Sequence, residues 1–403
     1  MRDKLEKNLK RCLKGRVKLS LATMIAFLLT GIVSYTAEED TFLHINESFL
    51  TNRDFEDNIK NEETKEYINN SFLKGIIEDK EYTSALNSEL EVLKFINNGN
   101  INYFNETLYS TKEPKERFLI QGKYNSFINN GTIISYNDKA HTIYASGFYR
   151  GDTYSTVSNA YIEVNSFINN GLVKVEEKIK VGSVPSGEGA DIRLRSSNGL
   201  SFINSTKVEN SGKIEGKILG ISTKGNGGLT SKVYSANAGN GMQNDDDSVS
   251  SFLKIENNGL IKGQSFAIGG NESYKSVTFK YSGNALNSYS STYEVENNGT
   301  LIGYVKGITE NDTVLIEKSG TALRTEEINR NVTNKGIMTG SEVAINTELV
   351  TANINNYGIM AGQKIIGTGK NEYNDTTGHI YNSIQEVDTD KYKNYGIEVI
   401  TEQ

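Results

Sequence analysis

One short pattern of apolar and polar positions recurs along most of this chain. An apolar residue is followed by a polar residue, Asn, one further residue and Gly, and then by two positions of which the second is usually apolar. Clear copies are FINNGTI at 127–133, IENNGLI at 255–261 and VENNGTL at 295–301. Nine copies occur, with glycines at positions 99, 131, 171, 212, 259, 299, 336, 358 and 396. Repetition at such intervals indicates a repeat architecture.

Each copy predicts a strand, a sharp turn and a second strand. In an extended backbone, alternation places Phe127 and Asn129 on one face and Ile128 on the other. Asn130 and Gly131 tolerate the positive φ that we expect in the turn, and Ile133 then returns to the inner face. Asn-Gly between alternating apolar positions is also typical of antiparallel hairpins, so a series of hairpins is the alternative.

The shared register of the copies favours parallel stacking over hairpins. If each copy lies above the one before it, Asn stacks on Asn and Phe on Phe, and the stacked amides form a ladder of hydrogen bonds. The predicted fold class is therefore all-β: a right-handed parallel β-helix, which is a solenoid, over residues 94–403. Only 2 Pro occur in 403 residues, as internal strands that donate hydrogen bonds require.

A second phrase combines Gly, a small residue and an aliphatic residue. It reads GQSFAIGG at 263–270 and GSEVAINT at 340–347, and shorter forms such as SGNALNS at 282–288 lie midway between copies of the first phrase. Most intervals between turn glycines are near twice the shortest, which is 22 residues. We therefore expect coils of about 20 residues, with the second phrase marking the intervening coils.

The first 93 residues differ from the repeats. Residues 1–18 are basic and Leu19 to Val33 are mostly apolar, which predicts a secretory signal peptide over 1–37; an uncleaved membrane anchor is the alternative. Residues 38–93 are rich in charge and contain a single Gly, Gly75. Local helical spacing there, as in Leu86, Leu90 and Leu93, predicts a partly helical N-terminal cap or linker.

Charge and cysteine content limit the partners of the mature chain. Residues 1–37 hold eight basic and two acidic residues, so the remainder carries 35 basic and 48 acidic residues, a net charge of −13. An acidic protein of this kind is a poor candidate for binding nucleic acid or an anionic membrane. The one cysteine, Cys12, lies in the leader, so the mature chain contains neither a disulfide nor a thiol nucleophile.

The long basic leader MRDKLEKNLKRCLKGRVKLSLATMIAFLLTG, followed by the Asn-Gly coils, resembles the N-terminal and passenger regions of autotransporters, the type V secretion proteins of Gram-negative bacteria. The resemblance implies export, display at the cell surface or outer membrane, and often a role as an adhesin in virulence. It also implies an outer-membrane β-barrel translocator as a partner. Residues up to Gln403 contain no such barrel pattern, so we expect a front piece of a longer product, a separate barrel protein, or simple secretion.

Residues that could carry chemistry are few. His44, His141 and His379 are far apart and form no zinc motif. The Gly-Asp-Ser-Gly phrase of passenger serine proteases is missing. Asp191, Arg193 and Arg195, in an insert at 182–199, resemble the charged sets of β-helix lyases and hydrolases that act on polysaccharide. A solvated loop is the alternative interpretation of that insert.

Two further groups of residues are candidate binding sites. The run Asn244 to Asp247 offers oxygen ligands for calcium but lacks calcium-loop spacing, so a loop tip is the favoured interpretation. Aromatic residues around 136–163 can mark a recognition face, but the favoured interpretation is that they belong to an ordinary solenoid exterior, which commonly carries aromatic residues; they are Tyr144, Phe148, Tyr149, Tyr154 and Tyr161.

The sequence therefore predicts no catalytic, cofactor-binding or metal-binding residue, and no cofactor. We expect an exported surface protein that acts as an adhesin or stalk and binds a host-surface protein or glycan through loops at 136–163, 182–199 and 223–250. The alternatives are a secreted β-helix polysaccharide lyase or hydrolase, and a truncated passenger without activity of its own.

Overall fold

The computed structural model describes most of the repeat region and part of the segment before it. The described residues are 42–45, 66–74, 76–78, 81–83, 85–104, 117–136, 141–143, 152–155, 157–181, 191–196, 198–202, 205–222, 232–244, 252–268, 276–288, 292–308, 313–368, 370–374, 379–382, 385–387 and 389–401. All regular elements within these ranges are β-strands. They include no helix of the length and apolar character that a membrane crossing requires. The expected signal peptide at 1–37 lies outside the described residues.

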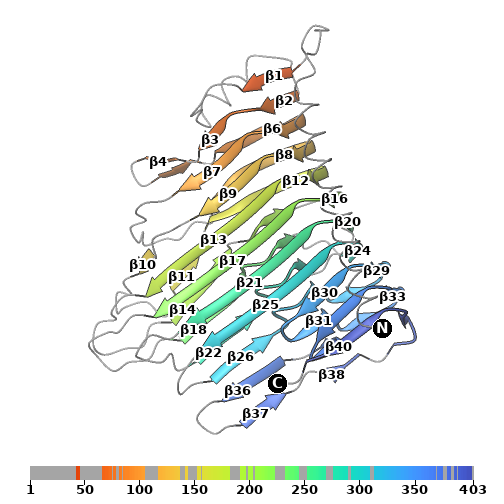
Figure 1. The fold of residues 1–403 in the computed structure, drawn as a ribbon. Coiled ribbons are helices and arrows are strands. Elements are labelled where there is room, and N and C mark those ends of the chain that lie inside the picture. The colour runs from red at the N-terminus through yellow and green to blue at the C-terminus, as the bar shows by residue number, and fades with distance from the viewer. Residues whose placement is uncertain are drawn as a thin grey trace, which may run out of the picture. The chain divides into compact units, whose positions relative to one another are not determined.

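The strands that carry the repeated Asn pair with one another in a long parallel ladder (Figure 1). We call them the asparagine strands, with their N-terminal neighbour β1: β1 (Phe42–Ile45), β2 (Glu66–Asn69), β6 (Leu86–Asn97), β8 (Arg117–Asn129), β12 (Val157–Asn169), β16 (Lys207–Asn210), β20 (Phe252–Asn257), β24 (Thr292–Asn297), β29 (Val332–Asn334), β33 (Ile354–Asn356) and β39 (Tyr392–Asn394). Each pairs in parallel with the next, and equivalent positions of the phrase face each other.

Direct pairing of successive copies corrects the expected coil length. Asn257 pairs with Asn297 and Asn334 with Asn356, so no coil lies between two copies of the phrase. A coil therefore varies in length, from 22 residues after Asn334 to 47 residues after Asn210. The second phrase does not mark separate coils of about 20 residues; it marks other strands of the same coil.

After the Asn-Gly turn, each coil continues into a second parallel sheet. Its strands are β3 (Phe72–Lys74), β7 (Asn100–Phe104), β9 (Thr132–Tyr136), β13 (Leu172–Val181), β17 (Lys213–Ser222), β21 (Leu260–Ile268), β25 (Thr300–Ile308), β30 (Ile337–Gly340), β34 (Ile359–Gly362) and β40 (Ile397–Ile400). They pair in chain order, one coil above the other. The hairpin alternative is therefore wrong for the repeats.

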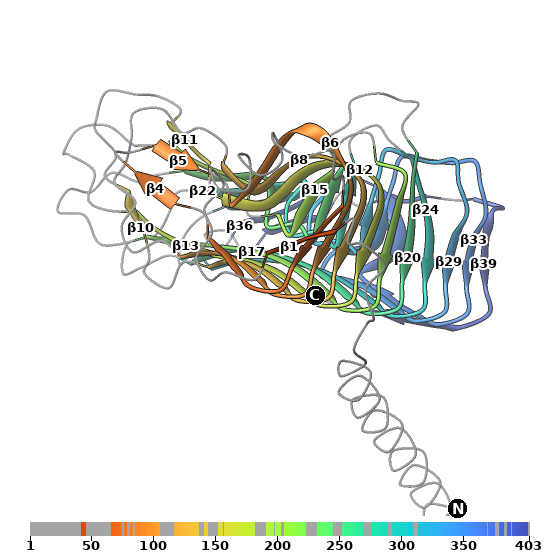
Figure 2. The ribbon, with the colours of Figure 1, turned by 90° about the horizontal axis from the view of Figure 1, so that it is seen from above.

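Two further sets of strands complete the longer coils. A third sheet contains β11 (Asp152–Ser155), β14 (Asp191–Ser196), β18 (Lys232–Ala238), β22 (Ser276–Lys280) and β26 (Thr313–Glu317), all parallel. The return strands lead back to the asparagine strands; they are β15 (Leu200–Phe202), β19 (Met242–Asn244), β23 (Leu286–Ser288), β27 (Leu323–Arg324), β31 (Val343–Asn346) and β35 (Lys364–Thr368). Near the C-terminus, β36 (Lys370–Asn374) and β37 (His379–Asn382) join the third sheet antiparallel. Figure 2 shows these strands following one another coil by coil.

A column of glycines marks the point where each coil approaches itself. Gly263, Gly303 and Gly340 are neighbours in the second sheet. A Cβ on Gly303 would lie 1.9 Å from the carbonyl oxygen of Thr321, and one on Gly340 would lie 1.9 Å from that of Val343. Thr321 lies shortly before the return strand β27, and Val343 begins the return strand β31. The backbone of the returning chain therefore contacts this column of glycines, and any residue with a Cβ would clash with it.

The glycine column explains why coil lengths differ. In one coil residues 304–320 separate Gly303 from Thr321, whereas in the next only Ser341 and Glu342 separate Gly340 from Val343. The return strands that follow are nevertheless in register, with Leu323 opposite Ile345. A longer coil therefore has the same parts as the 22-residue coil plus an inserted segment, which we call an excursion. The excursion begins after the glycine of the column, includes a strand of the third sheet and ends at the start of the return strand.

The stacked amides form the ladder that the sequence predicts. From Asn69 to Asn394, each side-chain Nδ2 donates to the Oδ1 of the next ladder Asn, through nine hydrogen bonds of 2.7 or 2.8 Å. Beside it, Phe95, Phe127 and Phe167 stack with ring centroids 5.0 and 5.4 Å apart. The predicted stacking of Asn on Asn and Phe on Phe is confirmed.

The turn glycines are needed for a reason other than the expected one. Gly131 does not have the positive φ that the sequence interpretation assigned to it; Gly122, Gly239, Gly283 and Gly320 do. A Cβ on Gly131 would instead lie 1.9 Å from the carbonyl oxygen of Gly99 in the coil before it. Close stacking of one turn on the next therefore excludes a side chain here.

The parallel ladder begins before residue 94, contrary to the expected boundary. Tyr67 and Asn69 pair with Phe95 and Asn97, and β1 pairs with β2. Ser71 stands where later coils have the turn glycine. The described parts of 38–93 also include an antiparallel pair, β4 (Ile76–Glu78) and β5 (Glu81–Thr83). A helical cap is not found in these described parts, and the remaining residues of 38–93 lie outside the description.

Candidate functional site

The C-terminal end of the described ladder presents an open edge. β39 pairs with β33 and β40 with β34, and no described strand pairs with their other sides. Tyr395 is 62% exposed, as Tyr357 is at 53% in the coil before it, and Ile397 and Ile400 are 58% and 57% exposed. Within the described residues, this edge therefore combines backbone groups that lack a partner strand with apolar side chains.

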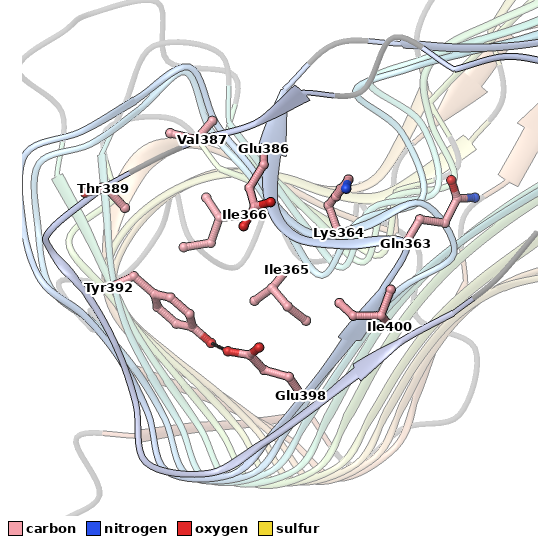
Figure 3. A pocket seen from close by; sticks show the side chains of 10 residues that line it. All are labelled: Gln363, Lys364, Ile365, Ile366, Glu386, Val387, Thr389, Tyr392, Glu398 and Ile400. Atoms are coloured by element: carbon pink, nitrogen blue, oxygen red, sulfur yellow. Dashed lines mark hydrogen bonds between the residues drawn. The ribbon is translucent and has the colours of Figure 1, made fainter.

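A partly open cavity of 720 Å³ lies at this end, surrounded by the residues of the last described coil (Figure 3). Tyr392, Glu398 and Ile366 point into it (Figure 3). The Tyr392 hydroxyl donates a 2.6 Å hydrogen bond to Oε1 of Glu398 across the cavity. The complete lining consists of Gln363, Lys364, Ile365, Ile366, Glu386, Val387, Thr389, Tyr392, Glu398 and Ile400.

Two residues of the cavity lining stand in core columns that are apolar in the coils before. Glu398 stands in the register of Met360 and Met338, both of which are buried. Tyr392 stands in the register of Ile354, which is also buried. Polar groups therefore occupy, in the last described coil, positions that hold apolar side chains in the coils before it. Sequence reasoning missed both residues, although the departure from the apolar pattern at these two positions was visible.

The environment of Tyr392 keeps its phenol protonated. Burial, together with the hydrogen bond to Glu398 and the negative charge of that carboxylate, raises the pKa of Tyr392 above its ordinary value of 10.0. The hydroxyl therefore remains a donor to the carboxylate at neutral pH. Beside the cavity, the Gln363 side chain donates to Oε2 of Glu342 at 3.1 Å. The cavity can thus hold apolar groups against Ile365 and Ile366 while its far side offers carboxylate acceptors.

A pair of tyrosines lies at the Asn-Gly corner of the last two coils. Tyr357 and Tyr395 follow ladder asparagines, and their rings stack with centroids 4.9 Å apart and an interplanar angle of 10°. In earlier coils the same corner carries Asn, as at Asn98 and Asn130, whose side chains hydrogen-bond to each other at 2.9 Å. With the neighbouring exposed Ile397, the tyrosine pair gives this end an aromatic and aliphatic corner.

The charged set proposed for polysaccharide chemistry is on a strand, not in a loop. Asp191, Arg193 and Arg195 belong to β14 of the third sheet, where Arg193 pairs with Thr153 and Tyr234. The pairing of β14 with β18 shifts register between Leu194 and Ser196, so Arg195 lies at an irregularity of the strand. The expected loop at 182–199 contains β14 of the third sheet, and the one at 223–250 contains β18 and the return strand β19; the other residues of these inserts lie mostly outside the description.

The other sequence candidates are not brought together. His44 lies in β1, His141 in β10 (His141–Ile143) and His379 in β37, in three different sheets. Asn244 ends β19 and is buried, so it is not at a loop tip, and Asp245 to Asp247 lie outside the described residues.

The aromatic group around 136–163 is only partly within the description. Tyr154 lies in β11 and Tyr161 in β12, which belong to different sheets. Tyr144, Phe148 and Tyr149 lie outside the described residues. In the part of the chain that is described, no group of three or more His, Cys, Asp or Glu side chains could hold a metal ion.

The chain was also compared with known proteins at three levels. No protein family model, no curated protein sequence and no solved structure matches it.

Proposed function

We propose that the stacked sheets are the faces of a right-handed parallel β-helix, and that the protein is an exported surface component that acts as an adhesin or structural stalk. Right-handed connections between parallel strands are the strong preference of L-polypeptides, which supports the handedness. The basic and apolar leader supports export, and its resemblance to autotransporter leaders supports an outer-membrane β-barrel translocator as the partner.

The observation that carries the proposal is the unbroken amide ladder from Asn69 to Asn394. Each ladder Asn from Asn97 to Asn356 is held on both sides by hydrogen bonds to the neighbouring ladder Asn, and these residues are buried. Such a ladder is satisfied only if every coil keeps its register with its neighbours, so bending or slipping at one coil leaves a buried amide unpaired. The result is a stiff scaffold whose length is set by coil number, as a stalk requires.

The excursions supply surfaces that the scaffold does not need. The 22-residue coil after Asn334 forms without one, and its strands still pair on both sides. In the longer coils, β13, β17 and β21 end at the same edge of the second sheet, at Val181, Ser222 and Ile268. The C-terminal ends of these three strands therefore lie side by side. We infer that the segments that follow them bind a host-surface protein or glycan.

A loop-trimming experiment tests this function. In each of the longer coils, the excursion is replaced by the Ser-Glu link of 341–342; residues 304–320 are one such segment. The trimmed chain is expected to keep its β-sheet circular dichroism spectrum and to lose adhesion to host cells and glycan arrays when displayed on bacteria. A chain in which only 309–312 is replaced by Gly-Ser residues serves as the control. Undiminished adhesion of the folded, fully trimmed chain would refute the proposal.

A second function is favoured by the position of β14. Asp191, Arg193 and Arg195 lie on one strand of a parallel sheet, and carboxylates with Arg or Lys on a strand are the groups that β-helix enzymes acting on acidic polysaccharide would use. Incubation of the full chain with uronic acid polymers, followed by absorbance of unsaturated products or by reducing-end assays, tests this alternative. Loss of any such activity in Arg193→Ala would support it, and the absence of products would remove it.

A further inference from the structure

The outer face of the second sheet carries an excess of positive charge. In its four middle strands β13, β17, β21 and β25, which lie side by side (Figure 1), every second residue is buried in the core, so the residues between them face outward. The charged residues at these outward positions, among the side chains that the structure describes, are five lysines and two glutamates: Lys174, Lys213, Lys217, Lys262, Lys306, Glu176 and Glu215. The face is therefore positive, although the chain after residue 37 has a net charge of −13.

The asparagine strands of the same coils have the opposite balance. In β16, β20 and β24 the charged outward positions hold two lysines and four glutamates: Lys207, Lys254, Glu209, Glu256, Glu294 and Glu296. Both lysines are neutralised by ion pairs, of 2.6 Å from Lys207 to Glu209 and of 2.7 Å from Lys254 to Glu256. The excess of lysine is thus a property of the second sheet and not of every face of the coils.

Most of the lysines on the second sheet have no neutralising carboxylate. Two of the five share Glu176, at N–O distances of 3.0 Å for Lys174 and 2.8 Å for Lys217. The other three form no ion pair among the described residues; they are Lys213, Lys262 and Lys306. Lys213 and Lys306 are also exposed. An anion in solution can therefore contact these three ammonium groups without displacing a carboxylate of the described chain.

An aromatic pair lies among these lysines. The rings of Phe266 and Tyr304, on neighbouring strands, have centroids 5.5 Å apart and planes inclined at 46°. Lys217 Nζ lies 5.9 Å from the centre of the Phe266 ring, and Lys306 is the register partner of Phe266 on β25. Gln264 pairs with Tyr304 in the same register. The half-buried rings thus form an apolar surface bordered by cations and an amide.

We propose that this face binds an acidic polysaccharide. Carboxylate or sulfate groups of the polymer contact the three lysines that lack an ion pair, and the apolar faces of its sugar rings lie against Phe266 and Tyr304. The four strands pair without a register shift, so at about 4.8 Å per strand the face extends over roughly 14 Å. A linear polymer that crosses the strands meets at least one lysine on each. This inference rests on the proposed function, because it names the class of host-surface glycan.

The residue types favour a polysaccharide over other polyanions. Nucleic acids are bound preferentially by arginine, whose planar guanidinium group matches phosphate, whereas the cations of this face that the structure describes are all lysines. An anionic membrane is bound through apolar side chains that enter the lipid layer, whereas Phe266 and Tyr304 are half-buried in the sheet surface. A sugar ring that stacks from outside needs no such insertion.

Binding of the full chain to immobilised heparin, a sulfated polysaccharide that contains uronic acid, tests the proposal by biolayer interferometry. In the test variant, glutamine replaces the three lysines of the second sheet that lack an ion pair, and we expect at least about tenfold weaker binding. The control variant carries Lys207→Gln, Lys254→Gln and Lys335→Gln, which remove the same charge from ion-paired lysines elsewhere on the coils. We expect its affinity to change less than about threefold. Tyr304→Ala, which changes no charge, is expected to weaken binding about threefold or more.

Three results would each overturn the inference. These are equal heparin binding by the test and control variants, unchanged binding by Tyr304→Ala, and no binding of the wild type at about 1 mM heparin. Single-stranded oligothymidylate that binds as tightly as heparin, and loses binding in the test variant, would assign the face to nucleic acid instead. Phosphatidylserine vesicles with the same behaviour would assign it to a membrane.

The test variant also separates this inference from the proposed function, because it keeps every excursion. If it binds heparin as well as the control variant does, while adhesion of displayed chains still requires the excursions, the polysaccharide face is refuted and the proposed function stands. If displayed chains lose no adhesion on trimming, whereas the test variant loses heparin binding, the reverse holds. Far-UV circular dichroism and the urea midpoint check that each variant is folded.

Discussion

Replacing Gly131 by Ala adds one methyl group at a turn where two coils touch. An ideal Cβ at this position lies 1.9 Å from the carbonyl oxygen of Gly99 and 2.9 Å from two backbone carbons, Asn98 C and Gly99 C. Real Cβ atoms essentially never come within 3.0 Å of such atoms, so the two turns must separate by more than about 1 Å. Neither contact is a flexible side chain that could move away.

That separation breaks or weakens the hydrogen bonds that cross the junction. They run from Asn130 N and Gly131 N to Asn97 O at 2.7 and 2.9 Å, and from Thr132 N to Gly99 O at 3.0 Å. The ladder amide of Asn97, which donates to Asn129 at 2.8 Å, is the fourth. With a net contribution of about 0.5–1.5 kcal/mol for each bond, we expect a loss of about 2–6 kcal/mol in the free energy of unfolding.

Urea unfolding followed by far-UV circular dichroism and tyrosine fluorescence measures this loss. Asn130→Ala is the matched control, because its exposed side chain gives up only amide contacts such as the one to Asn98, and we expect a loss below about 1 kcal/mol. A third variant, Gly131→Asn, separates the clash from a requirement for positive φ, which Asn tolerates better than Ala. If Gly131→Asn is clearly more stable than Gly131→Ala, the steric explanation is refuted.

Three other predictions concern the ladder, the cavity and the modular coil. Asn257→Leu leaves buried ladder amides unpaired and is expected to cost about 2–4 kcal/mol in urea unfolding, whereas the exposed Asn298→Ala should cost below about 1 kcal/mol; equal costs would contradict the role of the inner ladder. The pKa of Tyr392 is raised in the folded state, so its contribution is complete below about pH 10 and falls as pH rises through the folded value. Stability above pH 10 should therefore decline more steeply in the wild type than in Tyr392→Phe, and identical alkaline profiles would argue against a buried phenol. Deleting 337–358, one complete coil, should leave a cooperative thermal transition, while deleting 337–347 should abolish it; equal damage from both would count against stacked coils.

The repeated phrase by itself was sufficient to predict what neighbouring coils do to each other. Alternation around Asn129 and Phe127 indicated strands, and the common register of the copies indicated parallel stacking with amide and aromatic columns. These predictions succeeded because they concern contacts between identical positions of neighbouring copies. Stacking in register brings such positions together whatever path the chain follows between them. The phrase also occurs as YINNSF at 67–72, but without its glycine this copy was not recognised, and the start of the ladder was placed too late.

The path of the chain within one coil could not be predicted in the same way. Gly303 and Thr321 are separated by a complete excursion, yet the requirement for glycine comes from the carbonyl group of Thr321. Arg324 shows the same limit: it aligns with Asn287 in the return strands, is completely buried, and its guanidinium carbon lies 4.1 Å from the centre of the Tyr281 ring. No local pattern marks an arginine for burial, because its partners come from distant parts of the coil.

The sequence alone thus determined the kind of element, the parallel register and the columns that stack, since these follow from side-chain alternation and from repetition. Only the tertiary structure decided how long a coil is, where excursions leave it, and why glycine is required at the turn. It also revealed that Tyr392 and Glu398 face one cavity at an open edge. Those features depend on which backbone atoms come close to each other across a coil or between coils. The distances between those atoms cannot be read from the spacing of residues along the chain.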